Sequence, residues 1–178
     1  MKDSILLSIF VFFLICTTKA QLVTNNTELQ AAISNASAGS EIILSNGTWN
    51  NVFININKSG NSSLPITITA QNPGAVFMTG NSRVYMRGNY VTISGLVFQN
   101  PANLVSSGSN IVPIFELNQC DNCKVINNKI DTYNGTEAQK TMKFKWVYIV
   151  DGQYNEIAHN SFIGKYGIGS IINDNRSL

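Results

Sequence analysis

The sequence predicts an all-β protein built as a parallel β-helix, in which the chain winds through coils of short strands. The main observation is a repeat, because the apolar residues Ile93, Val125 and Ile157 recur every 32 residues (93, 125, 157). A second observation is that each copy is short, β-branched and alternating, as a strand is. A fixed period of this size is typical of stacked units that bury their apolar faces against one another.

Polar residues inside the repeat predict how the coils are held together. Asn128 and Asn160 occupy equivalent positions in the second and third copies, where the first copy has Leu96. Asn tolerates a left-handed backbone bend, and its amide can bond to the next Asn in a stack. We therefore expect an asparagine ladder between successive coils. The alternative is two unrelated turn asparagines in an Asn-rich chain.

The beginning of the chain predicts a secretory signal peptide over residues 1–20. Lys2 precedes an apolar run at 5–16, and small residues lead to a cleavage site between Ala20 and Gln21. The run is too short to span a bilayer, so a retained anchor is the weaker alternative. We expect a mature chain of 21–178 that is secreted or periplasmic and leaves no membrane segment after cleavage.

Charge excludes two classes of partner. The chain carries 12 basic and 10 acidic side chains, for a net charge of +2. Removal of the predicted signal peptide takes away Lys2, Lys19 and Asp3, which brings the net charge close to +1. A balance so near neutrality predicts neither nucleic-acid binding nor attraction to an anionic membrane surface.

The first ordered element after Gln21 is expected to be an amphipathic helix. Thr27 can cap its start, Gln30 can reach back to complete a capping box, and Gly39 can end it. Four small or apolar residues share one helical face: Leu29, Ala32, Ile33 and Ala36. A stacked β-helix exposes an apolar end, so we expect this helix to serve as an N-terminal cap.

Short strands and turns fill the rest of the chain. The strands are expected at 41–44, 52–56, 65–69, 76–78 and 84–86, ahead of the first repeat. Longer polar loops interrupt the repeats at 100–110 and 134–141. In a solenoid such insertions project from one face and often build the binding surface.

Several segments, taken in order, resemble a known family. They are Asn-Gly-Thr-Trp at 46–49, Ser-Leu-Pro-Ile-Thr-Ile-Thr-Ala at 63–70, Asn-Pro-Gly-Ala-Val at 72–76, Thr-Gly at 79–80, and the first repeat at 91–98. Together they resemble the opening coils of polysaccharide lyase family 6, which contains alginate lyases and chondroitinase B. The resemblance covers about 28–178 and implies a right-handed, pectin-lyase-like β-helix.

The resemblance also implies an activity, namely β-elimination on uronic-acid polysaccharides. Alginate is the first expected substrate, and dermatan sulfate or chondroitin the second. Such chemistry needs a group that neutralises the uronate carboxylate, a base for the C5 proton and an acid for the leaving oxygen. The resemblance implies that family members use a calcium ion held by Asn and Glu side chains, a Lys as the base and an Arg as the acid. All of these residues lie in later coils.

Neither the Glu-rich strand that carries the Lys nor the Arg-His-Gly segment occurs in this sequence. We therefore assign no catalytic residue and no metal ligand to the chain, and expect calcium only in a full-length family member. The chain is predicted to be the N-terminal portion, 21–178, of a truncated lyase that is inactive by itself. The alternative function is a non-catalytic β-helix module that binds glycans or acts as an adhesin.

Two lysines are the predicted substrate-binding residues, Lys143 and Lys145. An alternating strand over 142–150 would turn its aromatic residues inward: Phe144, Trp146 and Tyr148. The lysines then face solvent, where they can contact an anionic polysaccharide or simply be solvated. The same two interpretations, contact with a polysaccharide or simple solvation, apply to Arg83 and Arg87.

The remaining chemical candidates are interpreted as structural. Cys120 and Cys123 form a lone Cys-X-X-Cys that β-structure follows, which leaves either a local disulfide or two free thiols at a coil corner. His159 falls in the bend of the third repeat with no evident orienting partner, so we expect a turn histidine. The acidic residues are too scattered for a calcium cage.

Overall fold

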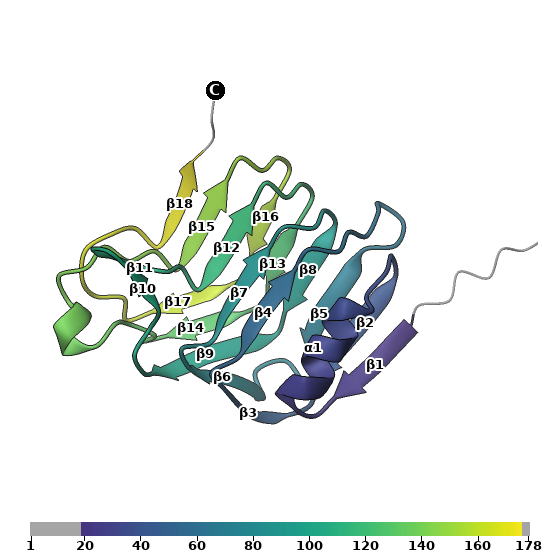
Figure 1. Cartoon of the computed structure of the whole chain (residues 1–178), viewed down its shortest axis with the longest axis horizontal. Coiled ribbons are helices and arrows are strands. Elements are labelled where there is room, and N and C mark those ends of the chain that lie inside the picture. Colours follow the sequence, from purple (N-terminus) through teal and green to yellow (C-terminus); the bar gives the residue numbers. More distant parts are fainter. Residues whose placement is uncertain (1–18, 176–178) are drawn as a thin grey trace, which may run out of the picture.

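The computed structural model describes residues 19–175, so nearly all of the predicted signal peptide (1–20) lies outside the described residues. The fold is a right-handed parallel β-helix in which three parallel sheets form the walls and each full coil contributes one strand to each wall (Figure 1). The predicted fold class is therefore confirmed. No helix within the described residues is long and apolar enough to cross a membrane.

The three sheets are named here by the order in which a coil visits them. Sheet A contains β1 (Lys19–Val23), β2 (Ser40–Leu44), β5 (Ile66–Ala70), β8 (Val91–Ser94), β13 (Lys124–Ile126) and β16 (Glu156–Ala158). Sheet B contains β3 (Gly47–Asn50), β6 (Val76–Gly80), β9 (Leu96–Pro101), β14 (Lys129–Asp131) and β17 (Ser161–Ile163). Sheet C contains β4 (Phe53–Ile56), β7 (Arg83–Met86), β12 (Phe115–Asn118), β15 (Val147–Val150) and β18 (Ile172–Asn175). The expected strands at 41–44, 52–56, 65–69, 76–78 and 84–86 correspond to β2, β4, β5, β6 and β7.

Inward-facing side chains stack in rows along the helix axis. In sheet A one row is Ile42, Ile68, Ile93, Val125 and Ile157. In sheet B the matching row is Trp49, Met78, Phe98, Ile130 and Phe162. The register therefore confirms the 32-residue repeat. Burying one such side chain contributes roughly 1.5–3 kcal/mol, so these rows are the main source of stability.

The asparagine ladder predicted from the repeat is present at the corner between sheets A and B. The Asn128 side chain accepts a hydrogen bond from Leu96 N at 3.0 Å and donates to Ile93 O at 3.1 Å in the coil before it. It also donates to the Asn160 side chain at 3.2 Å, in the coil after it. Asn128 thus supplies partners for backbone groups that the sharp corner leaves without strand partners.

The N-terminal helix α1 (Asn26–Ser34) covers the first coil as predicted, and it packs against β1, β2 and β4. Its four expected core residues are buried: Leu29, Ala32, Ile33 and Ala36. The predicted capping was wrong. The cap is Asn25, whose extended backbone lets its side chain accept a hydrogen bond from Glu28 N at 3.0 Å, so the helix begins before Thr27. It also ends at Ser34 rather than Gly39, because the backbone N–H of Asn35 already closes the last turn on Ala31 O.

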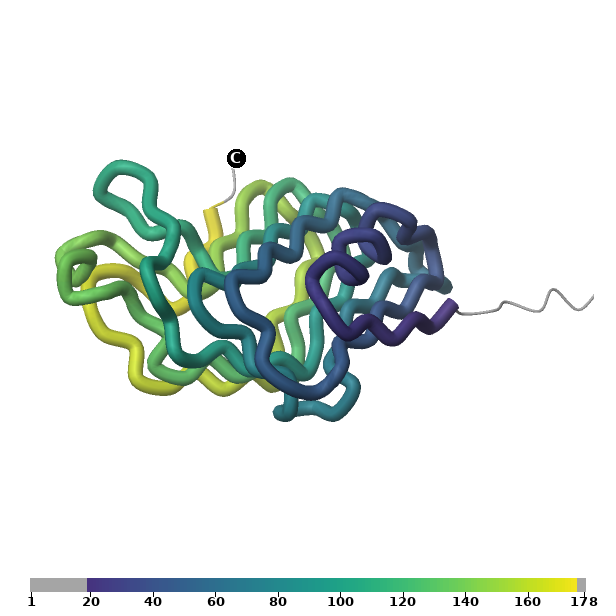
Figure 2. Tube along the Cα trace, turned by 60° about the horizontal axis from the view of Figure 1, so that its bottom comes forward, coloured from purple at the N-terminus to yellow at the C-terminus, as the bar shows by residue number. Residues whose placement is uncertain are grey.

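The two predicted insertions contain short elements of their own. In the first loop β10 (Ser106–Ser107) pairs antiparallel with β11 (Asn110–Ile111), and in the second η1 (Glu137–Gln139) is a single 3₁₀ turn. Gln139 Nε2 donates to Leu104 O at 2.6 Å and so ties the loops together. Figure 2 shows both insertions at the same side of the solenoid. They lie at the start of sheet C, where insertions often build a binding surface.

Tyr133 anchors the second insertion to the core. Its ring is buried and meets Phe98 edge-on at 5.7 Å between centroids. Its hydroxyl donates to Gly80 O at 2.7 Å and lies 3.0 Å from Ser82 O. Burial raises the pKa of the Tyr133 phenol well above its ordinary value, against a smaller opposing effect of its hydrogen bonds and of Arg83.

This raised pKa predicts alkaline destabilisation. Above about pH 10 an unfolded tyrosine loses its proton while the folded Tyr133 keeps it, so the folded state binds more protons and stability falls as pH rises. We expect the urea midpoint of the wild-type chain to fall between pH 9 and 11. In Tyr133→Phe, which cannot ionise, the fall should be shallower, although the variant starts roughly 1–2 kcal/mol less stable at pH 8. If the urea midpoints of the wild-type chain and Tyr133→Phe fell equally with pH, the buried Tyr133 phenol would not be the cause of the alkaline destabilisation.

Candidate functional site

The outer face of sheet C combines aromatic and charged side chains in register. Inward residues of β7, β12 and β15 enter the core, and the alternate residues Tyr85, Glu116 and Tyr148 point outward as directly paired neighbours. Adjacent strands lie about 4.8 Å apart, so the three side chains form a row with that spacing along the solenoid axis. This row is the centre of the candidate site.

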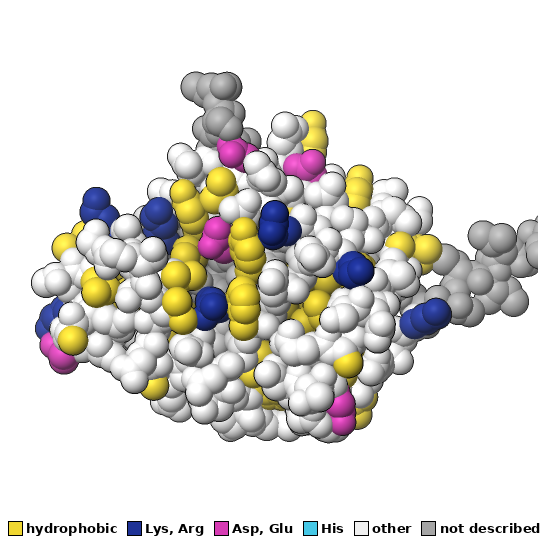
Figure 3. All heavy atoms as spheres, viewed as in Figure 1, with side chains coloured by type: hydrophobic (Ala, Val, Ile, Leu, Met, Phe, Trp, Pro, Cys, Tyr) yellow, Lys and Arg dark blue, Asp and Glu magenta, His cyan; other side chains and the backbone are white. Residues whose placement is uncertain are grey.

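Three cations lie over aromatic rings on this face. The Arg83 guanidinium is 4.1 Å from the Phe53 ring centroid, Arg87 is 5.8 Å from that of Tyr85, and Lys145 Nζ is 3.9 Å from that of Tyr148. Figure 3 shows Lys and Arg side chains interspersed with hydrophobic ones on the face that sheet C presents. A cation held over a ring is positioned but keeps its charge for a ligand. Partial burial lowers the pKa of Arg83, which nonetheless stays charged at neutral pH because its ordinary pKa is so high.

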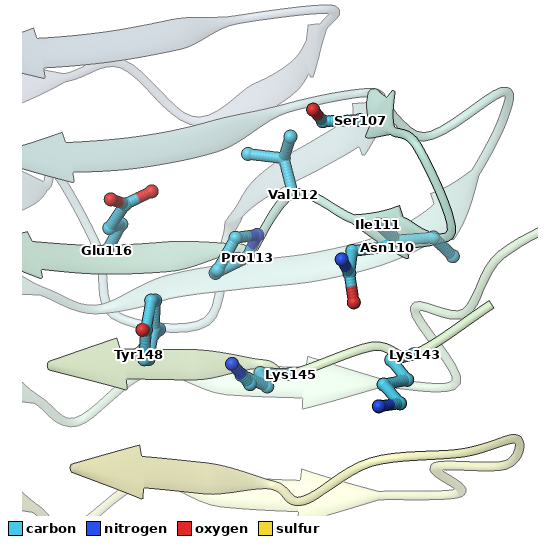
Figure 4. Close-up of a pocket in the computed structure, with 9 residues that line it drawn as sticks. All are labelled: Ser107, Asn110, Ile111, Val112, Pro113, Glu116, Lys143, Lys145 and Tyr148. Carbon is cyan, nitrogen blue, oxygen red and sulfur yellow. The ribbon is translucent and has the colours of Figure 1, made fainter. Parts of the chain in front are cut away.

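Two shallow hollows follow this row, and we call them together the sheet C groove. The first has a volume of about 310 Å³, and its lining includes Lys143, Lys145 and Tyr148 (Figure 4). The second has a volume of about 300 Å³, and its lining includes Phe53, Arg83 and Tyr85. Val112, Pro113 and Glu116 line both hollows, which makes the groove continuous across β4, β7, β12 and β15.

Both lysines predicted to bind substrate line the groove. Lys143 is exposed and its backbone bridges to Asn110 and Ile168, whereas Lys145 is half-buried against Tyr148. Arg83, the other basic candidate, lies two strands away on the same face. The structure therefore brings together basic residues that are about 60 positions apart in the sequence, which is a geometric finding and leaves their binding role a prediction.

The predicted strand over 142–150 needs a correction. The strand β15 begins only at Val147, and Trp146 and Val147 are both buried, so the alternation shifts by one residue. Trp146 turns inward ahead of the strand because its indole nitrogen donates to Tyr133 O at 2.8 Å. Tyr148 consequently faces outward into the groove instead of inward, and it becomes a site residue that the sequence pattern had placed in the core.

Glu116 was missed as a site residue. It lies between Tyr85 and Tyr148 in the row, with a carboxylate oxygen 3.2 Å from Asn118 Nδ2. Among the described residues it forms no ion pair, although it shares the groove with Arg83 and Lys145. Its spacing of one coil from each tyrosine was a signal in the sequence, but it required the register that only the structure provides.

The other candidates lie away from the groove. Cys120 and Cys123 are buried free thiols at the corner between sheets C and A, and Cys123 Sγ donates to Gly88 O at 3.0 Å. A hydrogen bond with Cys123 and burial raise the pKa of the Cys120 thiol far above its ordinary value, so it is not a nucleophile. His159 is exposed at a corner with φ of 56°, in the bend where it was expected.

The calcium ion that the family resemblance implies has no cluster of acidic side chains to hold it among the described residues. Between residues 19 and 175 no three His, Cys, Asp or Glu side chains come together as metal ligands. Calcium binding needs a cage of several oxygen ligands around one point. Calcium in a full-length family member stays a prediction.

Comparisons with known proteins agree with this architecture. The chondroitinase B family model matches residues 23–178. The structure of the PL6 family alginate lyase AlyGC superposes with a TM-score of 0.78 at 28% identity, covering 87% of this chain and 21% of that one. A PL6 family polysaccharide lyase from Pseudopedobacter saltans gives a TM-score of 0.70 at 27% identity, covering 86% of this chain and 33% of that one. No curated protein sequence matched the chain.

A further structural match supports the fold alone. A mannuronic-acid-specific family 6 lyase from the human gut microbiota has a TM-score of 0.73 at 22% identity, covering 88% of this chain and 37% of that one. The chain thus spans between about a fifth and two fifths of the length of these solved structures. Because the family model covers nearly all of the described coils, the chain belongs to the chondroitinase B family, the family 6 polysaccharide lyases.

Proposed function

We propose that this chain is part of a secreted or periplasmic enzyme that cleaves uronic-acid polysaccharide by β-elimination. Alginate is the preferred substrate in this proposal, and dermatan sulfate or chondroitin the second. The observation that carries it is the family match over 23–178, together with a continuous basic and aromatic groove on sheet C. A solved relative is named as an alginate lyase, which favours alginate as the first substrate to test.

The groove has the chemistry to hold such a polymer. A uronate chain carries a carboxylate on each sugar, and Lys143, Lys145 and Arg83 offer cations along the groove. Sugar rings can lie beside the half-buried Tyr85 and Tyr148, which present apolar area with a polar tip. These described residues bind and orient; the carboxylate neutraliser, base and acid of the elimination are not assigned to them.

A non-catalytic glycan-binding module is the second candidate function. The observation that favours it is that the described coils by themselves form a groove lined by basic and aromatic side chains. Both candidates predict polysaccharide binding by this chain. They differ in whether the protein that contains this chain also cleaves the bound polysaccharide.

An assay of binding and cleavage on the same sample tests the proposal. We expect the chain to be retarded most in native gels that contain alginate, less in dermatan sulfate, and least in a neutral glucan. With calcium added, no new absorbance from unsaturated uronate ends should appear, because a base, an acid and a metal cage are all required. Equal mobility in all gels would contradict the groove as a polyanion site, and clear absorbance would contradict the expected inactivity.

Glu116→Gln should strengthen binding of alginate. The carboxylate lies in the middle of the groove, where it repels uronate carboxylates, and the amide keeps its size. Removing one exposed like-charge contact is expected to raise affinity about threefold, with a smaller gain at high salt. Glu41→Gln is the matched control, because Glu41 is also half-buried, lies on sheet A and forms no ion pair among the described residues. Weaker binding by Glu116→Gln would show that this carboxylate accepts hydrogen bonds from the sugar instead.

A further inference from the structure

The corner between sheets A and B has a hollow that is separate from the sheet C groove. Four successive coils turn there through one residue with a left-handed backbone: Gly74 (φ 85°), Gly95 (φ 78°), Asn127 (φ 57°) and His159 (φ 56°). The last two project side chains and form a ridge, whereas the two glycines leave the ridge open. A hollow of about 350 Å³ lies at this place.

The hollow joins one aromatic side chain with several polar ones. Phe77, Val97, Lys129 and Ser161 form an outward row across sheet B, each directly paired with the next. Phe77 is half-buried, so part of its ring faces the hollow, and Gln99 also lines it. Among the described residues, the side chains of Gln99 and Ser161 make no hydrogen bond to the protein, which leaves their donors and acceptors for a ligand.

Charge separates this hollow from the groove. Lys129, the lysine in its lining, pairs with Asp131 at 2.7 Å, so it contributes little net charge. An aromatic face beside amide and hydroxyl groups suits a ligand with one apolar side and many hydroxyls, because pockets combine apolar area with a few convergent polar groups. A pyranose ring has that character without needing a carboxylate.

We propose that the hollow at Gly74 and Gly95 is a second carbohydrate-binding site, which takes a hydroxyl-rich sugar ring on the face of Phe77. Gln99 and Ser161 would hold its hydroxyls, and the side chains of Asn127 and His159 would bound it on the ridge. The hollow opens at the sheet A–sheet B corner and the groove at sheet C, so the two sites occupy different walls of the solenoid (Figure 1).

A filling variant tests the site with little disturbance of the fold. A Cβ at Gly74 would meet no atom within 4 Å, and Asn tolerates a left-handed backbone, so Gly74→Asn places an amide in the hollow. Gly108→Asn is the matched control, because Gly108 has φ of 55° and equally open space in the hairpin between β10 and β11. Phe77→Ala removes the aromatic face independently.

The probe is a neutral mannotriose, followed by ligand-observed saturation-transfer NMR. The wild-type chain, Gly108→Asn and an Arg83→Ala, Lys145→Ala groove variant are expected to bind it alike. Gly74→Asn and Phe77→Ala should each weaken binding by about fivefold or more, the size expected for the loss of one stacking contact. No binding by the wild-type chain, or equal binding by all variants, would overturn the site. Because the probe is neutral, either result leaves alginate binding at the groove to be judged by its own assay.

Discussion

The Arg83→Ala, Lys145→Ala double variant is expected to bind alginate about tenfold more weakly than the wild-type chain. Each cation lies at a partly exposed site where one ionic contact contributes roughly 0.7 kcal/mol, and 1.4 kcal/mol corresponds to a factor of ten. Both cations are already held over aromatic rings, so little side-chain entropy is lost when a carboxylate binds. Isothermal titration with a defined alginate oligosaccharide at low salt measures the difference.

Salt and a charge-matched control separate site binding from general attraction. Lys58 and Lys124 are exposed and lie off the outer face of sheet C, so Lys58→Ala, Lys124→Ala changes the net charge by the same amount. We expect this control variant to bind alginate with nearly the affinity of the wild-type chain. The difference in alginate affinity between the wild-type chain and the groove variant should become smaller as the salt concentration rises, because exposed ionic contacts are screened. Equal weakening in both double variants would mean that net charge alone attracts the polymer.

Asn128→Ala is expected to destabilise the chain by about 3 kcal/mol, the largest stability effect predicted here. The variant leaves Leu96 N and Ile93 O without their side-chain partners at a buried corner, at roughly 1–3 kcal/mol for each unsatisfied group. At about 2–4 °C per kcal/mol for a chain of this size, the melting temperature should fall by roughly 10 °C. Thermal and urea unfolding, followed by circular dichroism, measure the loss.

Asn55→Ala is the control for this prediction. Asn55 is exposed on β4, so its replacement should change stability by no more than about 0.5 kcal/mol. The ladder explanation would be wrong if the two variants unfolded at the same temperature. A loss confined to Asn128→Ala would show that the corner amide, and not asparagine content in general, holds the coils together.

Much of the fold could be predicted from the sequence because a solenoid is made of local repeats. Each coil contacts its neighbours in the stack, and from Ile93 onward equivalent residues of sheet A are 32 positions apart, so the register of Ile93, Val125 and Ile157 follows from their spacing. The same spacing placed Asn128 against Asn160. Predictions that depended on a single boundary were less secure, and the helix cap moved from Thr27 to Asn25 because several residues near that start can accept a backbone hydrogen bond.

The candidate site was only half visible in the sequence. Composition and alternation identified Lys143 and Lys145 as outward-facing, but the same alternation placed Tyr148 in the core. The tertiary contact between Trp146 and Tyr133 decided otherwise, since it draws the indole inward before the strand begins. Side chains alternate between the two faces of a strand, so one extra inward-facing residue moves every later side chain of that strand to the opposite face.

By itself, the sequence determined the class of fold, the repeat, the corner ladder and the family, because these depend on side-chain periodicity and on contacts between equivalent positions. Only the tertiary structure decided that Arg83, Glu116, Lys145 and Tyr148 line one groove. It also decided that two corner glycines open a hollow on another wall. The physical reason is that surface sites depend on which coil lies beside which, and on where each insertion reaches, and no local pattern encodes either.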